Sequence, residues 1–556
     1  MRLLLVTEKC GPTADQRDCG ARLVTTLRRA FGDSLDVLQF GETTDEDATE
    51  HHVYPYQGGD RFLRRLRNAD FVAERVRAVA ARYTHVLFVH VSMQFGFARD
   101  PLVGRRVWTM PMFLTPSYVA SGEVVPAEYT VRERLVLRTT DRILTPSHLE
   151  HRQIVETYGV DPERVRVVPR GVDRLPGTPH VRRLNGPLQL CSVGSVKRQK
   201  NTLGLVTLFA AIRGRYPDAR LRVIGPIQDA GYADEVRATV AALGLESAVE
   251  FVGYVPPSDL AIATADAHVH LSASHCETFG RAIFETLSLG LPNVIPAQDN
   301  AAAEYLADRP YARFYESPAD ALEQLEAVLA DLEQHSAMAV EVGHLFDDDF
   351  LSARLAAEIS EAPTLAASDF DGTLWHKTDA LRTQRSVQQF NQFSVRVICS
   401  ARPLVDLMTA ARGAGATADY YVAWSGGVVA DSDGHVLWRE PLTDAERERL
   451  LQSHPDARPL QEDGATMQFT LPCGESVMPT RARTETYANT TYALPWRASK
   501  LQAVVRLLQS IDWRGRVRAF GDGRYDDELL TYFDGVRVRA AVNDVRQAEE
   551  VTDEAA

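Results

Sequence analysis

The stretch Ser368-Asp369-Phe370-Asp371-Gly372-Thr373-Leu374 follows a short apolar run and holds two aspartates that are one residue apart. If residues 365–370 form a strand, the alternation of side chains puts both carboxylates on the same side of it. Two carboxylates held close together repel each other unless a cation lies between them, and Mg²⁺ prefers such oxygen ligands. One carboxylate could then attack phosphorus while the other transfers a proton. A solvated acidic turn is the alternative, and this stretch alone favours neither.

Length and composition describe a soluble protein of several domains. A chain of 556 residues is long enough for roughly three or four folding units, and 45% hydrophobic with 24% charged residues is typical of globular proteins. The net charge of −14 argues against nucleic acid or an anionic membrane as a partner. The six cysteines show no metal-ligand spacing, and the apolar residues 1–6 are too few for a signal peptide. We therefore expect a cytoplasmic protein.

The first half of the chain alternates strand-like apolar runs with helical patterns, which is typical of doubly wound α/β sheets. Residues 170–187 contain three prolines and three glycines and form a predicted linker between two such lobes, so that a cleft would lie between them. Ligands of these folds collect at the carboxyl ends of strands. The loops after Val6 and Val89 are therefore candidate acceptor contacts, and His90 is either a ligand contact or a buried, partnered histidine.

Two stretches of the second predicted lobe carry chemical groups. At residues 193–201 a strand leads into a helix with the cations Lys197, Arg198 and Lys200, although the whole chain has only five lysines. Cations beside a helix N-terminus suit a diphosphate, and a solvated basic turn is the alternative. Further on, Glu277 precedes a predicted helix and Glu285 lies about two turns into it. Such carboxylates can accept hydrogen bonds from sugar hydroxyls, unless they are a helix cap and a surface residue.

The spacing of Glu277 and Glu285 resembles the E-x7-E motif of retaining GT-B glycosyltransferases, and Phe279-Gly280 stands between them as in that family. Residues 290–292 and 169–173 resemble its G-x-P and P-x-G-V-D segments. The likeness spans about residues 1–350. It implies an α/β fold of two Rossmann-like lobes, with an acceptor lobe at 1–180 and a donor lobe at 181–361 whose last helices cross back to the first lobe.

By this resemblance the donor is a nucleotide sugar of the UDP or GDP type. Glu285 would hold the ribose hydroxyls, Glu277 the donor sugar and Lys200 the diphosphate. The full set of expected donor-binding residues is Lys200, Arg198, Glu277, Phe279, Gly280 and Glu285. Two positions depart from the family: Ser195 replaces an arginine, for which Arg198 or Lys197 could substitute, and Met110-Pro111 replace a histidine. We expect front-face transfer without a metal, because lysine and helix N–H groups can stabilise the leaving diphosphate.

The second half adds further polar groups at strand ends and helix starts. Ser400 ends the apolar run 395–399, Lys500 opens a helix of good apolar periodicity, and Asp522 and Asp526 follow the run 517–520. These are the positions that build active sites at the carboxyl edge of α/β sheets. Taken singly, each has a plainer interpretation as a helix cap or a surface turn.

Together with Asp369 and Asp371, these residues resemble the four motifs of the haloacid-dehalogenase (HAD) phosphatases over about residues 363–556. The resemblance implies the following roles: Asp369 as nucleophile, Asp371 as general acid/base, Ser400 and Lys500 as phosphoryl ligands, and Asp369, the carbonyl of Asp371, Asp522 and Asp526 as Mg²⁺ ligands. Tyr525 stands where the family often has asparagine, and Asp527 is the less favoured metal ligand. It also implies a Rossmann-like core at 362–424 and 497–556 with an α+β cap at 425–496, which would contain a hairpin at 428–437.

The order of the two units resembles a sucrose-phosphate-synthase-like transferase fused to a sugar-phosphate phosphatase. This implies transfer of a sugar to a phosphorylated acceptor, followed by Mg²⁺-dependent hydrolysis of the phosphate to give the free glycoside. Two alternatives stay open: the second unit is a binding or regulatory module, or it acts on an unrelated phosphate ester.

Overall fold

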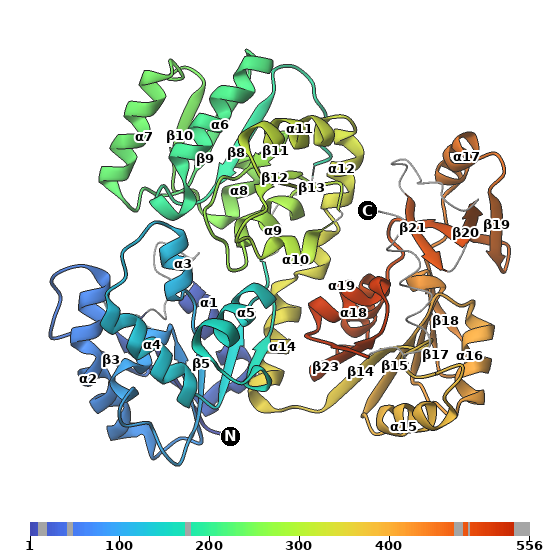
Figure 1. Ribbon diagram of the computed structural model, residues 1–556, viewed down its shortest axis with the longest axis horizontal. Coiled ribbons are helices and arrows are strands. Elements are labelled where there is room, and N and C mark those ends of the chain that lie inside the picture. The colour runs from blue at the N-terminus through green and yellow to red at the C-terminus, as the bar shows by residue number, and fades with distance from the viewer. Residues whose placement is uncertain are drawn as a thin grey trace. The chain divides into compact units, whose positions relative to one another are not determined.

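The computed structural model describes residues 1–8, 19–41, 48–172, 180–307, 309–471, 482–487 and 490–538. The expected acceptor contacts at 9–12 and the aspartate at the end of the 169–173 segment lie outside these residues. The chain forms two compact units, Met1–Ala356 and Ala357–Ala556, whose elements are labelled in Figure 1.

The first lobe of the first unit has a parallel sheet in the order β3-β2-β1-β4-β5-β6-β7. The strands of this sheet are β1 (Leu3–Thr7), β2 (Leu35–Phe40), β3 (Glu50–His52), β4 (His85–Val89), β5 (Arg106–Met110), β6 (Arg142–Thr145) and β7 (Val165–Val167). Strand β1 is buried along its whole length, as expected for a parallel strand covered on both faces. The α-helices are α1 (Cys19–Phe31), α2 (Arg61–Ala80), α3 (Thr115–Ala120), α4 (Ala127–Thr139) and α5 (His148–Tyr158), and the short 3₁₀ segments are η1 (Gly32–Ser34), η2 (Val91–Phe97) and η3 (Pro162–Arg164).

The second lobe has a parallel sheet in the order β10-β9-β8-β11-β12-β13. Its strands are β8 (Gln189–Val193), β9 (Arg220–Ile224), β10 (Val249–Gly253), β11 (Val269–Leu271), β12 (Asn293–Pro296) and β13 (Ala312–Tyr315). The 3₁₀ segments η4 (Arg198–Lys200) and η5 (Pro257–Asp259) accompany the α-helices α6 (Thr202–Arg215), α7 (Ala230–Ala242), α8 (Leu260–Ala263), α9 (Arg281–Ser288), α10 (Ala302–Leu306), α11 (Pro318–Leu329), α12 (Leu332–Ala339), α13 (Val342–Leu345) and α14 (Asp348–Ser360).

The start of helix α14 returns to the first lobe. The hydroxyls of Thr26 in α1 and Ser352 in α14 lie 3.0 Å apart, and Arg29 forms an ion pair with Asp349 at 2.7 Å. Gly171 packs so closely on this segment that an added Cβ would lie 2.3 Å from the Cα of Asp348. The crossing-back segment is therefore fixed by backbone approach as well as by polar contacts.

The second unit has a main sheet in the order β18-β17-β16-β15-β14-β23-β24 and a smaller antiparallel sheet in the order β19-β20-β22-β21. The main-sheet strands are β14 (Thr364–Asp369), β15 (Val395–Cys399), β16 (Tyr420–Ala423), β17 (Val428–Asp431), β18 (Val436–Arg439), β23 (Arg516–Gly521) and β24 (Val536–Arg537). The small-sheet strands are β19 (Arg458–Glu462), β20 (Ala465–Leu471), β21 (Ala482–Tyr487) and β22 (Thr490–Pro495). The helices of this unit are α15 (Ala380–Phe390), α16 (Leu404–Gly413), α17 (Asp444–Ser453), α18 (Lys500–Ser510) and α19 (Asp527–Tyr532), with the 3₁₀ turns η6 (Trp424–Gly426) and η7 (Arg524–Asp526).

The hairpin that the sequence assigned to the cap lies elsewhere. Strands β17 and β18 pair antiparallel with each other, and β17 pairs with β16, so the hairpin extends the main sheet. The physical reason is the apolar run Val428, Val429 and Ala430, which is fully buried and therefore needs cover on both faces. The separate small sheet begins only at β19.

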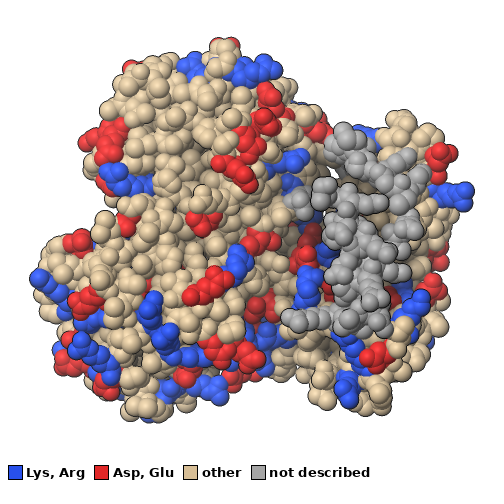
Figure 2. Space-filling model, in the orientation of Figure 1, with Lys and Arg blue, Asp and Glu red and all other residues tan. Residues whose placement is uncertain are grey.

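On the face shown in Figure 2, acidic and basic residues are interspersed. Among the described helices, none combines the length and the apolar composition that a membrane crossing requires.

Two glutamates are buried in the first lobe. The side chains of Glu133 and Glu150 are 0% exposed, and both carboxylate oxygens of Glu150 lack a hydrogen-bond partner in the described structure. Burial raises the pKa of Glu150 to about 8, although the Arg170 charge opposes this shift, and burial raises the pKa of Glu133 to about 7. Both side chains are therefore held in the protonated form near neutral pH.

This burial predicts a pH-dependent stability of the first unit. The folded pKa of Glu150 is raised above its usual value of 4.5. The contribution of Glu150 to the free energy of unfolding is therefore complete below pH 4.5 and is lost as the pH rises toward 8. Between pH 5 and pH 8 the free energy of unfolding should fall by on the order of 3 kcal/mol because of this group.

In Glu150→Gln the free energy of unfolding should fall less between pH 5 and pH 8, because the contribution of Glu150 is removed. Denaturant unfolding at the two pH values measures this difference. The exposed Glu246→Gln is the matched control. Equal pH slopes in the wild type and Glu150→Gln would contradict the prediction.

Candidate functional site

The first candidate site lies where β8 leads into η4 and α6. Lys200 is the last residue of η4, and its Nζ lies 2.5 Å from Oε1 of Glu277. Asn201 takes a left-handed conformation with φ 49°, and its side chain accepts the N–H of Gly204 at the start of α6. The predicted basic turn thus leads into helix α6, and its Lys200 forms an ion pair with Glu277, a predicted donor-binding residue.

Glu277 is held at the head of α9 by its main chain. Its N–H donates to the carbonyl of Asp299 at 2.9 Å, and its carbonyl accepts the N–H of Ala301 at 2.8 Å. Gly280 follows with φ 81°, and a Cβ there would lie 2.8 Å from Cδ1 of Ile283. The left-handed backbone therefore favours glycine at this position.

A small cavity gathers part of the predicted donor site. It brings Lys200, Glu277 and Gly280 together with the end of β8. Glu285 is the fifth residue of α9 and 4% exposed, so it lies about one turn into the helix and is not a surface residue. Phe279 is 3% exposed and stacks on Phe284 with ring centroids 4.6 Å apart. Its side chain therefore packs in an aromatic cluster.

The two candidate substitutes for the missing arginine separate in the structure. Arg198 forms an ion pair with Glu235 at 2.6 Å, and its guanidinium lies 5.1 Å from the ring centroid of Tyr232. Arg198 is therefore not brought to Glu277. Lys197 precedes η4 and is half-buried, and burial, with a smaller contribution from the Lys200 charge, lowers its pKa to about 8.

The first lobe contributes a cluster that the sequence did not indicate. His90 has φ 76°, its Nδ1 accepts the N–H of Ser92 at 3.2 Å, and its Nε2 lies 3.4 Å from the Tyr118 hydroxyl. Burial, and then the charges of Arg65 and Arg61, hold the pKa of His90 well below its usual value. His90 is thus half-buried, with hydrogen-bond partners in the first lobe. The arginines escaped notice because they belong to an arginine-rich helix, α2, without a motif.

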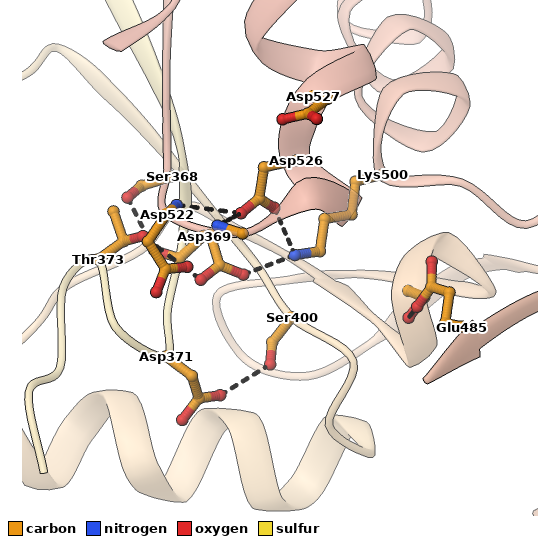
Figure 3. Close-up of polar contacts among 12 residues, drawn as sticks. Ser368, Asp369, Asp371, Thr373, Ser400, Glu485, Lys500, Asp522, Asp526 and Asp527 are labelled. Atoms are coloured by element: carbon orange, nitrogen blue, oxygen red, sulfur yellow. Dashed lines mark hydrogen bonds and ion pairs between the residues drawn. The ribbon is translucent and has the colours of Figure 1, made fainter. Parts of the chain in front are cut away.

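The second candidate site is built around Lys500, the first residue of α18. Its Nζ lies 2.6 Å from Oδ1 of Asp369 and 2.7 Å from Oδ1 of Asp526 (Figure 3). All three side chains are almost fully buried. Burial raises the pKa of Asp369 to about 8, and the charges of Asp526 and Asp522 add to it against the opposing effect of Lys500.

The carboxylates of this site fit a hard cation. Oxygens of Asp369, Asp522 and Asp526 lie within 4.8 Å of one another, and one ammonium offsets only part of their charge. Gly372 has φ 80°, and a Cβ there would lie 1.9 Å from Oδ2 of Asp522, so this glycine makes room for the cluster. The less favoured ligand Asp527 is paired with Arg537 instead.

The Asp371 carboxylate contacts Ser400 and Arg402 and is not directed toward Lys500. Arg402 donates to both of its oxygens, at 2.8 and 2.5 Å, and the Ser400 hydroxyl donates at 3.2 Å. Figure 3 shows this carboxylate directed toward Ser400 and not toward Lys500. Proton transfer by Asp371 would require the Arg402 pair to open. Sequence reasoning missed Arg402, although it follows Ser400 by two residues.

Comparison with known families covers the first unit. Residues 180–341 match the family model described as "Glycosyl transferases group 1", and residues 21–174 match "Glycosyltransferase Family 4". The D-inositol 3-phosphate glycosyltransferase of Acidothermus cellulolyticus is 34% identical over 250 residues, which are 40% of this chain and 55% of that protein. The mannosylfructose-phosphate synthase of Agrobacterium fabrum is 24% identical over 198 residues, 32% of this chain and 43% of that protein. The chain thus spans about half the length of the curated relatives it matches.

Solved structures resemble the same part of the chain. Sucrose-phosphate synthase of Thermosynechococcus elongatus is similar with a TM-score of 0.52 at 17% identity, covering 65% of this chain and 99% of that one. The Anabaena protein HepE in complex with UDP is similar with a TM-score of 0.51 at 17% identity, covering 65% and 100%. The predicted α/β GT-B fold of the first part is therefore confirmed.

The geometry at Lys500 predicts a large loss of stability in Lys500→Met. Removal of the ammonium leaves two buried carboxylates unpaired, which costs about 3–5 kcal/mol. We expect the calorimetric melting temperature of the second unit to fall by about 10 °C. The exposed Lys377→Met is the matched control, and equal melting temperatures for the two variants would refute the structural role of Lys500.

Proposed function

We propose that the first unit transfers a sugar, with retention, from a nucleotide-sugar donor to a phosphorylated acceptor. The match of residues 21–174 and 180–341 to two glycosyltransferase families supports the reaction class. The observation that carries the proposal is the Lys200–Glu277 pair at the head of α9, because it joins a cation for the diphosphate to a carboxylate for the sugar.

In the proposed reaction the leaving diphosphate lies at this end of the second lobe. As the bond from the sugar to the diphosphate breaks, negative charge develops on the diphosphate. Lys200, the half-buried Lys197 and the N–H groups at the start of α6 can stabilise that charge. Glu277 would exchange its contact with Lys200 for hydroxyls of the donor sugar, and Glu285 would hold the ribose.

The names of similar proteins support the choice of substrates. The relatives named D-inositol 3-phosphate glycosyltransferase and mannosylfructose-phosphate synthase favour a phosphorylated acceptor here. HepE is described in complex with UDP and glucose, which favours a UDP-type donor over a GDP-type one.

We infer that the second unit is a phosphatase of the HAD type. Its carrying observation is Lys500 between Asp369 and Asp526. Asp369 would attack phosphorus to form an aspartyl-phosphate, while Asp371, once released from Arg402, protonates the departing alcohol oxygen. Water would then hydrolyse the aspartyl-phosphate, with Asp371 accepting its proton, and Ser400 and Lys500 hold the phosphoryl oxygens. Mg²⁺, held by Asp369, Asp522, Asp526 and the Asp371 carbonyl, would supply charge neutralisation.

In this proposal the product of the first unit is the substrate of the second. Hydrolysis removes the phosphorylated glycoside and draws the transfer forward. A regulatory second unit, or one that acts on an unrelated ester, would leave the phosphorylated product untouched.

The coupled reaction predicts an intermediate. Asp369→Asn removes the nucleophile, so incubation with a UDP-sugar and a sugar phosphate should accumulate a phosphorylated glycoside, whereas the wild type with Mg²⁺ releases phosphate and free glycoside. Mass spectrometry of the products measures both. The exposed Asp406→Asn is the matched control. If the wild type also accumulated the phosphorylated glycoside, the second unit would have no role in this series of reactions.

The donor site predicts ligand-dependent stabilisation. A bound donor raises the melting temperature, because at a free donor concentration L it stabilises the folded state by RT ln(1 + L/Kd), so UDP-sugar should stabilise the first unit. Glu285→Ala should lose most of this shift, because a hydrogen bond to a charged group is worth about 1.5–3 kcal/mol, whereas Glu246→Ala should keep it. An unchanged shift in Glu285→Ala would remove Glu285 from the donor site.

A further inference from the structure

Strand β11 carries a buried histidine near the middle of the second-lobe sheet. The strand lies between β8 and β12 in the sheet order (Figure 1), and its His270 is paired in register with Cys191 and Asn293. The His270 side chain is 1% exposed. Buried polar groups need hydrogen-bond partners from the protein or from ordered water, so the role of His270 depends on what its two ring nitrogens contact.

One ring nitrogen of His270 contacts the core of the lobe. Its Nδ1 lies within hydrogen-bond distance of Oδ1 of Asn293. The Asn293 amide is oriented by its own nitrogen, which donates to the Leu291 carbonyl at 2.9 Å and to the Thr286 hydroxyl at 3.2 Å. The Asn293 oxygen is therefore the acceptor toward His270, and Nδ1 of the ring carries the proton.

The other ring nitrogen is an unused acceptor. Nε2 of His270 is buried and makes no hydrogen bond to any residue in the described part of the chain. Burial lowers the pKa of His270 to about 4, and the Lys200 charge adds to this shift, so the ring is neutral at physiological pH. With the proton on Nδ1, Nε2 offers a lone pair and can only accept a hydrogen bond.

His270 lines the cavity of the donor site. The other polar side chains that line this cavity are those of Lys200 and Glu277 and the hydroxyls of Ser192, Ser195, Thr202, Ser272 and Ser274. The cavity has a volume of about 20 Å³, and one water needs roughly 10–15 Å³ of such space and about two to four polar partners. The cavity therefore has the size and the polarity of a site for a single water.

The ammonium of Lys200 has N–H groups to spare. Its Nζ lies 2.5 Å from Oε1 of Glu277, a contact that uses one of the three N–H groups. The side-chain carbons pack on the turn after β8, where a Cβ on Gly194 would lie 3.5 Å from Cδ and Cε of the lysine. A second N–H can therefore point to a bound diphosphate and a third into the cavity.

A neutral acceptor affects this lysine differently from a carboxylate. Glu277 offsets the charge of the ammonium that it holds, and in the proposed reaction it turns to the hydroxyls of the donor sugar. Lys200 would then lose its partner as negative charge develops on the leaving diphosphate. A neutral imidazole that acts through one water can keep the ammonium in place without offsetting its charge, so the charge stays available to the diphosphate.

We propose that His270 is a positioning residue of the donor site: its Nε2 accepts a hydrogen bond from one buried water, and that water accepts a hydrogen bond from the ammonium of Lys200. The inference rests on the proposed transfer reaction and deepens it. His270 holds Lys200 toward the diphosphate after Glu277 has turned to the sugar.

The experiment separates the two ring nitrogens by substitution in the full-length chain, with UDP as the probe. His270→Gln keeps an acceptor near the position of Nε2, whereas His270→Asn keeps a polar group near Nδ1 and removes that acceptor. In isothermal titration calorimetry, Kd for UDP should rise about tenfold in His270→Asn and less than about threefold in His270→Gln, because a hydrogen bond that supports a charged group is lost only in the first. In the Lys200→Met background, the two His270 variants should bind UDP equally.

His268→Asn is the matched control. His268 lies one residue before β11, is also buried, and accepts the N–H of Gln189 at 2.9 Å. It lines a different cavity, at the other end of the strand, so its substitution should leave Kd for UDP unchanged.

Three results would overturn the proposal while leaving the donor site in place. These are an unchanged Kd in both His270 variants, equal losses of affinity in His270→Asn and His270→Gln, and a difference between these two variants that persists in the Lys200→Met background. The second result would mean that His270 only supports the fold, and the third that it does not act through Lys200. If the wild type bound neither UDP nor GDP, the proposed donor site would be wrong, and this inference with it.

Discussion

The second unit depends on one buried ammonium between two buried carboxylates. Lys500 contacts Asp369 at the end of β14 and Asp526 in η7, so it joins three segments that are far apart in the sequence. Such a group of charges is tolerable in a core only when every member is paired. Gly372 packs on Asp522 and Gly426 packs on Ser499, so both bring backbone close to the charged group.

The first unit uses a related arrangement at the mouth of its second sheet. Lys200 and Glu277 come from two βα connections of one parallel sheet, whose carboxyl edge is where such folds bind ligands. The difference between the sites is exposure: Lys200 keeps a partly accessible side chain, whereas Lys500 is buried. A partly accessible pair can open for a diphosphate, and a buried group can hold a nucleophile in place. Both arrangements are what the proposed sequence of transfer and dephosphorylation requires.

The sequence predicted the chemical importance of several residues but not the direction of their side chains. Asp371 was expected to transfer a proton, yet its carboxylate is occupied by hydrogen bonds from Arg402 and Ser400. Arg198 was a candidate for the diphosphate, yet it pairs with Glu235. Phe279 belongs to the donor motif, but its ring packs in the core. A motif specifies residue type and spacing along the chain, whereas the direction of a long side chain depends on partners that the chain supplies from elsewhere.

The sequence by itself determined the parallel α/β organisation and the placement of Asp369, Lys500 and Asp526 at strand ends and helix starts. These follow from local apolar periodicity and from short motifs, which act within a few residues. Tertiary structure alone decided that the 428–437 hairpin joins the main sheet, that Arg198 pairs with Glu235, and that Glu485 of the small sheet contacts Ser425. The reason is physical: burial and ion pairing join groups that are distant in sequence, and each can be satisfied by many partners until the fold selects one.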